Sequence, residues 1–253
     1  MKKQIWKPGN MLYPLPAVLV SCGNRAGETN ILTVAWTGTV CTSPAMVYIS
    51  VRPERYSDSL LRDSGEFVIN LSTESLVRAA DYCGVKSGRD TDKWSACGLS
   101  AGRASTLQYA PVITESPVNI ECRVTEVREL GSHHMFLAEV TAVQVDEALL
   151  DASGKLRLND AGLLAYSHGE YFRLGNLLGS FGYSVRKKTP VPPAVPGPGA
   201  GRQKSGSKAA ETQKQPNPGS VHETKSSGAS GSKHGKSGNA HLSAAGRNAR
   251  KLT

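Results

Sequence analysis

Two β-rich runs lie close together in the sequence and constrain the fold more than any other feature. Residues 31–40 and 45–51 are dense in Val, Ile, Thr, Tyr and Trp, and only residues 41–44 separate them. These side chains favour the pleated backbone of a strand, and so short a connection leads back antiparallel. We therefore predict a β-hairpin here and take it as the centre of the fold.

Polar side chains within and after this hairpin are typical of a ligand-binding surface. A flat polar ligand that ends in a phosphate would suit an aromatic wall, short hydrogen-bonding side chains and guanidinium groups. The alternative is a half-exposed, Thr-rich hairpin followed by a solvated arginine pair, and these residues alone leave both interpretations open. The set comprises Asn30, Thr33, Trp36, Thr37, Thr39, Thr42, Arg52 and Arg55.

The chain divides by composition near Thr189. Residues 1–188 carry 20 Lys and Arg against 19 Asp and Glu. Residues 189–253 carry 10 basic and 2 acidic residues and no Phe, Trp or Tyr. A segment so poor in apolar side chains cannot offset its ordering entropy by burial. We predict one folded domain over residues 1–188 and a disordered basic tail, rich in Pro, Gly, Ser and Lys, over residues 189–253.

The five cysteines (Cys22, Cys41, Cys83, Cys97 and Cys122) are odd in number and have no CxxC spacing, which is typical of reduced thiols. The first ten residues contain two lysines but no apolar run of signal-peptide length, and no stretch approaches transmembrane length. We therefore expect a cytoplasmic protein that does not enter the membrane.

The remaining periodicity predicts a mainly β fold with short helices. Further strands are expected over residues 15–23, 66–71, 117–130 and 135–145, with a bulge just after Glu126 where the apolar alternation changes parity. Ser57 is expected to cap one short helix, and Ser72 or Thr73 a second that ends at Gly84. No regular βαβ alternation occurs, so a closed or nearly closed antiparallel barrel is favoured over a doubly wound sheet.

Familiar catalytic motifs are absent or fail in context. The chain has no GxGxxG after a strand, no Walker loop and no HExxH. Ser100 lies in a literal G-x-S-x-G, but a polar run precedes it where a hydrolase elbow needs a strand. His133 and His134 are adjacent, so on a strand they face opposite sides and cannot both bind one metal ion. His168 and Lys93 carry little weight when each is taken alone, and no metal site is predicted.

Several segments together resemble the flavin reductase-like family of FMN-binding split-barrel proteins, and its flavoredoxin branch in particular. The resemblance covers about residues 10–188 and does not extend to the tail. The segments are TVAWTGT (33–39), YISVRPERYS (48–57), GEFVIN (65–70), DYCGV (81–85), SGRD (87–90) and GSHH (131–134).

The resemblance implies an antiparallel split β-barrel, usually a homodimer, with FMN near the dimer interface. Asn30, Trp36, Lys93 and His133 match positions that meet the flavin in this branch, and Tyr166 falls near an aromatic position at the cofactor. On physical grounds we add Arg52, Arg55 and Ser57 as candidates for the phosphate. The backbone N–H groups from Ala35 to Thr37 are candidates for the flavin ring edge. No side chain is expected to act as a catalytic acid or base.

Three functions follow, in order of preference. The first is an oxidoreductase that passes electrons from NADH or NADPH to flavin. The second keeps the FMN but makes the protein an electron carrier, reduced by a protein partner. The third is weak, salt-sensitive binding of a polyanion such as RNA by the basic tail, which has no aromatic residue to stack on bases.

Overall fold

The computed structural model describes residues 1–186, so the predicted tail over residues 189–253 lies outside the described residues. The strands are β1 (Leu15–Pro16), β2 (Val18–Gly23), β3 (Thr29–Val34), β4 (Thr37–Thr42), β5 (Ala45–Val51), β6 (Glu66–Leu71), β7 (Ala101–Gly102), β8 (Val112–Ile113), β9 (Val118–Glu129), β10 (His134–Val145), β11 (Leu164–Ser167) and β12 (Glu170–Arg173). The helices are α1 (Tyr56–Ser64), α2 (Val77–Val85) and α3 (Lys93–Cys97), with short 3-10 turns at Glu74–Leu76, Glu147–Leu149, Leu158–Ala161 and Tyr183–Val185.

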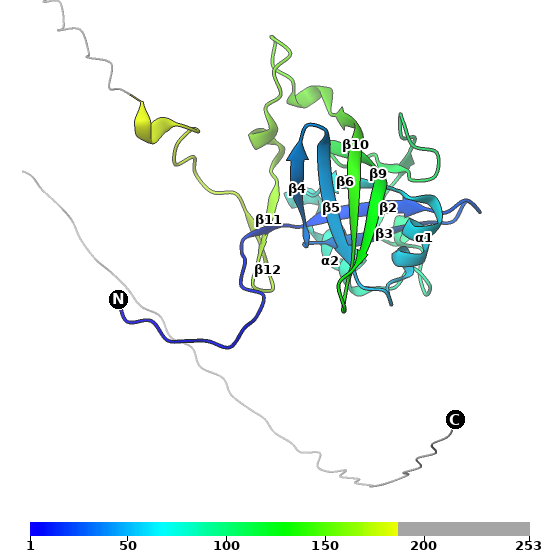
Figure 1. Ribbon diagram of the computed structural model, residues 1–253. Helices are drawn as coiled ribbons and strands as arrows, with labels where there is room; N and C mark the ends of the chain where they lie inside the picture. Colours follow the sequence, from blue (N-terminus) through cyan, green and yellow to red (C-terminus); the bar gives the residue numbers. More distant parts are fainter. Residues whose placement is uncertain (187–253) are drawn as a thin grey trace, which may run out of the picture. The chain divides into compact units, whose positions relative to one another are not determined.

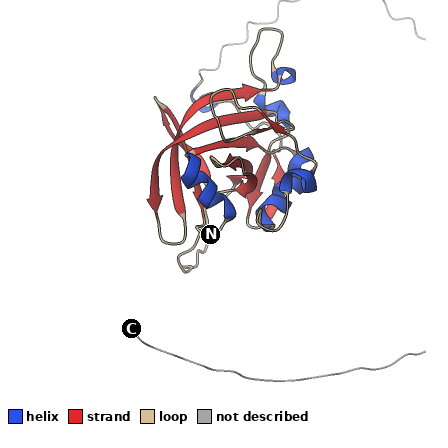
Figure 2. Cartoon of the chain, turned by 90° about the vertical axis from the view of Figure 1, so that its right-hand side faces the viewer, coloured by secondary structure: helices blue, strands red, loops and turns tan. Residues whose placement is uncertain are grey.

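Seven strands form one antiparallel sheet in the order β3-β2-β6-β9-β10-β5-β4 (Figure 1). The sheet curves round on itself (Figure 2), and buried side chains fill its interior. A separate small sheet joins β1, β11 and β12, and β7 pairs with β8. The predicted mainly β, antiparallel architecture with short helices is confirmed.

The first β-rich run is not one strand, which corrects the predicted hairpin. β3 ends at Val34 and β4 begins at Thr37, and these two strands lie at opposite edges of the seven-stranded sheet. Ala35 and Trp36 carry the chain across. The Ser50 N–H donates to the Trp36 carbonyl at 2.9 Å, which ties this crossing to β5. Only β4 and β5 form the expected hairpin. The sequence did not reveal the break between β3 and β4, because no Gly or Pro lies between residues 34 and 37.

The strand β2 is buried on both faces because the two faces meet different partners. Val18 and Val20 pack in the barrel core with Phe67 and Phe136. Leu19 belongs to a second apolar cluster, to which α2 and α3 contribute. A strand buried on both sides reads as a continuous apolar run rather than an alternating one, as LPAVLVSCG does.

The helix α1 closes part of the barrel through Leu60 and Leu61, which join the barrel core. It ends at Gly65, whose φ of 70° is the left-handed conformation common after a helix. Ser57 does not cap this helix, contrary to expectation: it lies inside the first turn, buried, and its hydroxyl accepts a 2.8 Å hydrogen bond from the Asn30 amide.

Neither Ser72 nor Thr73 caps α2, contrary to expectation: a 3-10 turn follows Thr73, and the residue before the helix is Leu76, which has no capping side chain. Gly84 does not end the helix either. Gly84 lies in the last turn, against β3. A Cβ placed on Gly84 would lie 3.4 Å from the Thr33 Cβ, an ordinary packing distance, so α2 packs directly on β3 here.

The long strands β9 and β10 match the predicted segments within one residue at each end. The pairing shifts between Leu137 and Ala138, where Thr125 is the extra residue of β9. The predicted bulge is thus confirmed about two residues before its expected position. A side chain on the expected polar face of β9, Glu121, is nevertheless fully buried.

Glu121 is buried beneath the loop that follows β7. Its carboxylate accepts hydrogen bonds of 2.6–2.8 Å from the N–H and hydroxyl groups of Ser105 and Thr106 and from the Gln144 amide. Burial alone would raise the pKa of this carboxyl, but these donors outweigh burial and lower the pKa to about 2. The carboxylate therefore fastens the covering loop to the barrel.

In the described part of the chain, no helix combines the length and the apolar character needed to cross a bilayer. All five cysteines are unpaired in the structure.

Replacing Glu121 should destabilise the fold in a pH-dependent way. Because its folded-state pKa lies below the ordinary 4.5, its stabilisation is complete above pH 4.5 and is lost as the pH falls toward 2. We expect Glu121→Gln to lower the free energy of unfolding by about 2–3 kcal/mol at pH 7 and by much less at pH 3. Urea unfolding at both pH values measures this, with the exposed Glu139→Gln as control. Equal losses at the two pH values would contradict it.

Candidate functional site

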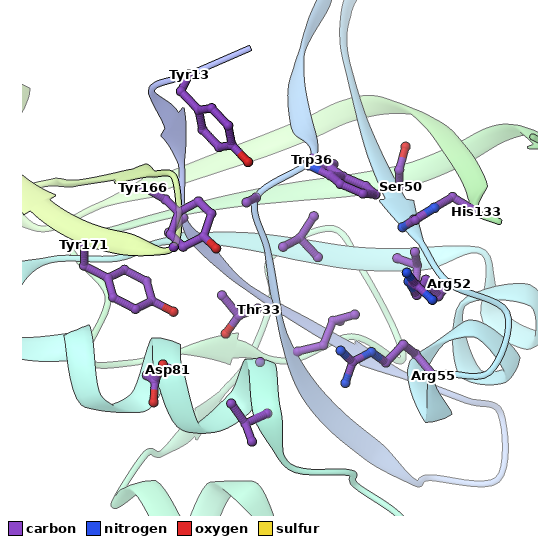
Figure 3. Close-up of a pocket in the computed structure, with 18 residues that line it drawn as sticks. Tyr13, Thr33, Trp36, Ser50, Arg52, Arg55, Asp81, His133, Tyr166 and Tyr171 are labelled. Carbon is purple, nitrogen blue, oxygen red and sulfur yellow. The ribbon is translucent and has the colours of Figure 1, made fainter. Parts of the chain in front are cut away.

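The break between β3 and β4 opens a cavity of about 400 Å³, which we call the seam pocket. Its walls come from the end of β3, the end of β5, α2 and the small sheet (Figure 3). Its polar and aromatic lining residues are Tyr13, Thr33, Trp36, Ser50, Arg52, Arg55, Asp81, His133, Tyr166 and Tyr171.

An aromatic pair forms one wall of the seam pocket. The Trp36 and His133 rings have centroids 4.3 Å apart and are tilted by 54°. His133 follows Gly131, whose φ of 72° turns the chain back toward β10. Burial first, and the nearby Arg52 guanidinium second, lower the pKa of His133 below its ordinary 6.5. His133 is therefore a neutral imidazole at pH 7.

His134 points elsewhere, as its alternation with His133 predicted. Its Nδ1 lies 2.7 Å from the Asp58 carboxylate and 3.0 Å from the Arg62 guanidinium. Arg62 also pairs with Glu129 at 3.0 Å. His134 thus serves an ion-pair network between α1 and the β9–β10 turn rather than the pocket.

The opposite wall of the seam pocket carries phenol and carboxylate groups. Tyr166 packs on Tyr13 and Tyr171 with ring centroids 6.3 and 5.4 Å away. Burial, then the neighbouring Asp81, raise the pKa of Tyr171, so this phenol is neutral at pH 7. Figure 3 shows these tyrosines and Asp81 facing the side that holds His133 and the two arginines.

A second cavity of about 400 Å³, the cation pocket, adjoins the first. The two share Leu32, Thr33, Arg52, Arg55 and Gly84 as lining residues, so together they form one trough. The remaining residues that line the cation pocket are Asn30, Glu54, Tyr56, Ser57, Cys83, Lys86, Ser87, Gly88 and Lys93.

Lys93 lines the cation pocket and is buried, although its surroundings in the sequence suggest a solvated loop lysine. It begins α3 and is only 4% exposed. Its Nζ donates to the carbonyls of Ile31 at 2.7 Å and Cys83 at 2.9 Å. Burial first lowers its pKa, and among the nearby charges Arg55 lowers it further. The fold thus holds two cationic side chains close together, which favours an anion between them.

Arg52 and Arg55 differ in what already holds them. Arg52 pairs with the Glu54 carboxylate at 3.1 Å. Within residues 1–186, Arg55 has neither an ion pair nor a side-chain hydrogen bond, although it lines both pockets. Arg55 is therefore the guanidinium with the most donors left for a ligand.

The trough brings together nine of the ten site residues that the sequence predicted. Thr37 is the exception: it is buried, its hydroxyl donates to the Tyr48 carbonyl at 2.6 Å, and it lines neither pocket. The nine are Asn30, Ala35, Trp36, Arg52, Arg55, Ser57, Lys93, His133 and Tyr166.

Sequence reasoning missed Tyr13, Ser50, Asp81 and Tyr171 as site residues, and it underrated Gly88. A Cβ at Gly88 would come within 2.3 Å of the Asn30 Oδ1, so only glycine lets this loop approach the cation pocket. The SGRD segment held a glycine signal, but nothing local marks the tyrosines, because β1, β11 and β12 meet only in the tertiary fold.

Ser100 is excluded as a nucleophile by its surroundings. It follows α3, where an elbow serine would precede a helix, and its N–H donates to the Glu115 carboxylate at 3.0 Å. Within the described residues, no group of three or more His, Cys, Asp or Glu side chains could hold a metal ion.

A family model described as flavin reductase-like domain matches residues 11–175. The chain belongs to the flavin reductase-like family. Its structure is similar to flavoredoxin of Desulfovibrio vulgaris (Miyazaki F), at 29% identity with a TM-score of 0.68, over 74% of this chain and all of that one. The predicted family and the likeness to flavoredoxins are confirmed.

Two further solved structures are similar to this chain. An FMN-binding protein from Thermus thermophilus, with bound 1-cyclohex-2-enone, is 26% identical, with a TM-score of 0.57 over 68% of this chain and 94% of that one. A split-barrel domain protein from Shewanella frigidimarina NCIMB 400 is 22% identical, with a TM-score of 0.61 over 67% and 86%. The last comparison confirms the split-barrel fold.

The protonation of His133 offers a test of the pocket's electrostatics. Since burial and Arg52 lower its pKa, we expect His133 to titrate below pH 6.5 and Arg52→Gln to raise its midpoint. NMR titration of the imidazole Cε1–H signal measures this, and Arg78→Gln on the exposed face of α2 is the control. A midpoint that ignores Arg52, or lies above 6.5, would show that the pocket is wetter or less positive than the structure indicates.

Proposed function

We propose that the chain binds FMN along the trough and works as an oxidoreductase. The observation that carries this proposal is the continuity of an aromatic-walled seam pocket with a cation pocket across shared residues. Such a pair of sites matches a flat ring joined to a phosphate. FMN is also supported by membership in the flavin reductase-like family and by the likeness to an FMN-binding protein.

The cation pocket would hold the phosphate. Arg55 supplies a planar fork of donors, and the Lys93 ammonium keeps one donor beyond the two that its carbonyl partners use. The Ser57 hydroxyl accepts from Asn30, which leaves its own proton free to point at a phosphate oxygen. These groups supply both charge and directed donors, so the residues present fit a dianion.

The seam pocket would hold the flavin ring. Trp36 and His133 offer an aromatic wall, and the backbone at Ala35 lies at the crossing between β3 and β4. Bound FMN would supply a two-electron acceptor and donor. The positive Arg52 beside the neutral His133 would favour an electron-rich ring at this wall. No side chain has to give or take a proton for this role.

The electron donor we propose is NADH or NADPH, which makes the protein a flavin reductase. The alternative is an FMN electron carrier reduced by a protein partner. The likeness to a flavoredoxin supports this alternative. In both, electrons would enter or leave at the seam pocket, because the aromatic wall that would hold the ring lies there.

A homodimer is also part of the proposal. Near the two ends of the described chain, large apolar side chains lie in water, among them Trp6 at 78% and Phe181 at 105% exposure. Exposed apolar side chains in this number support burial against a second copy. The cytoplasmic location and weak polyanion binding by the tail stay predictions.

Arg55 gives the sharpest test of FMN binding. Because its side chain has no ion pair or hydrogen bond within the described residues, Arg55→Met removes ligand contacts and keeps the backbone hydrogen bonds of Arg55. We expect FMN affinity to fall about 10- to 100-fold, the loss of one or two charge-assisted hydrogen bonds, with an unchanged melting temperature. Flavin fluorescence titration measures it, with Arg78→Met as the matched control. Equal affinity of Arg55→Met and wild type would place the phosphate elsewhere.

One anaerobic experiment separates reductase from carrier. The purified full-length protein, loaded with FMN, is mixed with NADH or NADPH, and the visible absorbance of the flavin is followed. Rapid bleaching and steady consumption of the nicotinamide after free FMN is added would support the reductase. Bleaching by dithionite but not by either nicotinamide would support the carrier. A colourless protein that takes up no FMN would refute both.

A further inference from the structure

Two thiols lie together beside the cation pocket. The Sγ atoms of Cys83, on α2, and Cys97, the last residue of α3, are 3.8 Å apart. Within residues 1–186 no other two thiols are in hydrogen-bonding contact; Cys22 and Cys41, for example, donate to carbonyl oxygens instead. The proposed flavin chemistry does not use this pair.

The two sulfur atoms are close enough to bond after a small movement. A disulfide has an S–S distance of about 2.05 Å, so the sulfur atoms must approach by roughly 1.8 Å. Cys97 is half-buried and precedes Gly98, whose φ of 63° ends α3. A rotation of the Cys97 side chain and a small shift of this five-residue helix would bring the sulfur atoms together.

The same helices hold Lys93. Lys93 is the first residue of α3, and Cys97 is its last. The Lys93 ammonium donates to the carbonyl of Cys83 itself, at 2.9 Å. A covalent bond between Cys83 and Cys97 would therefore move the helix that carries Lys93 relative to the Cys83 carbonyl that orients its ammonium.

We propose that Cys83 and Cys97 form a reversible disulfide, and that its formation weakens anion binding in the cation pocket by displacing the Lys93 ammonium. The second half of this proposal rests on the proposed function. The first half does not.

Cys97 is half-buried and Cys83 is buried, so a disulfide from solution reaches Cys97 first. Burial, then the neighbouring Cys97, raise the pKa of the Cys83 thiol to about 12, so Cys83 is not the first thiol to react. The Cys97 thiolate attacks a small disulfide such as oxidised glutathione, forms a mixed disulfide and releases one glutathione thiolate. The Cys83 sulfur then loses its proton, attacks the Cys97 sulfur and releases the second glutathione. Two protein thiols are oxidised, and one glutathione disulfide is reduced to two thiols.

Peptide mapping tests the bond directly. Trypsin cleaves after Arg78, Lys86, Lys93 and Arg103, so Cys83 and Cys97 fall in separate peptides, residues 79–86 and 94–103. After the full-length protein is treated with oxidised glutathione and its remaining thiols are alkylated, we expect these two peptides to appear linked, and dithiothreitol to separate them. Cys41→Ser should keep the link, and Cys97→Ser should lose it. A glutathione adduct on Cys97 with no linked peptide would overturn the disulfide.

Flavin titration of the same samples tests the link to Lys93. We expect the oxidised protein to bind FMN at least threefold more weakly than the reduced protein, and Cys97→Ser to bind equally in both conditions. Equal affinities of oxidised and reduced wild type, with the linked peptide present, would overturn the displacement of Lys93. Linked peptides in a protein that binds no FMN in either state would refute the proposed function and the coupling, and would leave the disulfide standing.

Discussion

The chain between Val34 and Thr37 has to leave one edge of the sheet and join the other, and the site depends on this crossing. A strand that continued through Ala35 and Trp36 would close the gap in which the seam pocket lies. The crossing is held by the hydrogen bond from the Ser50 N–H to the Trp36 carbonyl. The same bond holds Trp36 at the wall of the seam pocket. One backbone contact thus fixes both the break between β3 and β4 and the position of this aromatic residue.

Two buried charges, Glu121 and Lys93, are satisfied to different extents by the fold. The Glu121 carboxylate accepts hydrogen bonds from the covering loop and from the neighbouring strand, so both of its oxygens are already engaged within the fold. Lys93 is buried to a similar degree, but two carbonyls satisfy only two of its three donors. A buried ammonium with one free donor beside Arg55 is costly unless an anion approaches. This difference makes the cation pocket, and not the Glu121 cluster, the place to expect a ligand.

The sequence predicted the regular parts of the fold and most of the trough, for identifiable reasons. β6 was found because it is a short run of strand-forming apolar side chains, and β9 because its first residues alternate regularly between apolar and polar. The crossing at Ala35 and Trp36 was missed because the strand-forming residues Val34 and Thr37 flank it and neither Gly nor Pro interrupts the run. Ser57 was taken for a cap because an N-cap and a buried first-turn serine look alike in sequence. Nine of the ten predicted site residues line the trough: five came from the likeness to a family, and Ala35, Arg52, Arg55 and Ser57 came from physical reasoning about a flat ligand with a phosphate. Tyr13, Asp81 and Tyr171 come together only through strand pairing and helix packing, which no local pattern encodes.

Lys93 joins the structural and the binding roles in one side chain, and this affects how its variants are to be understood. Removing the ammonium leaves the carbonyls of Ile31 and Cys83 without their partner in a dry site, which destabilises β3 and α2 by about 1–3 kcal/mol for each group left unsatisfied. A loss of affinity in such a variant therefore mixes a lost contact with a loosened pocket. Arg55 has no such second role among the described residues. The anion end of the trough thus consists of a fixed charge that the fold itself needs and a movable charge that only a ligand would engage.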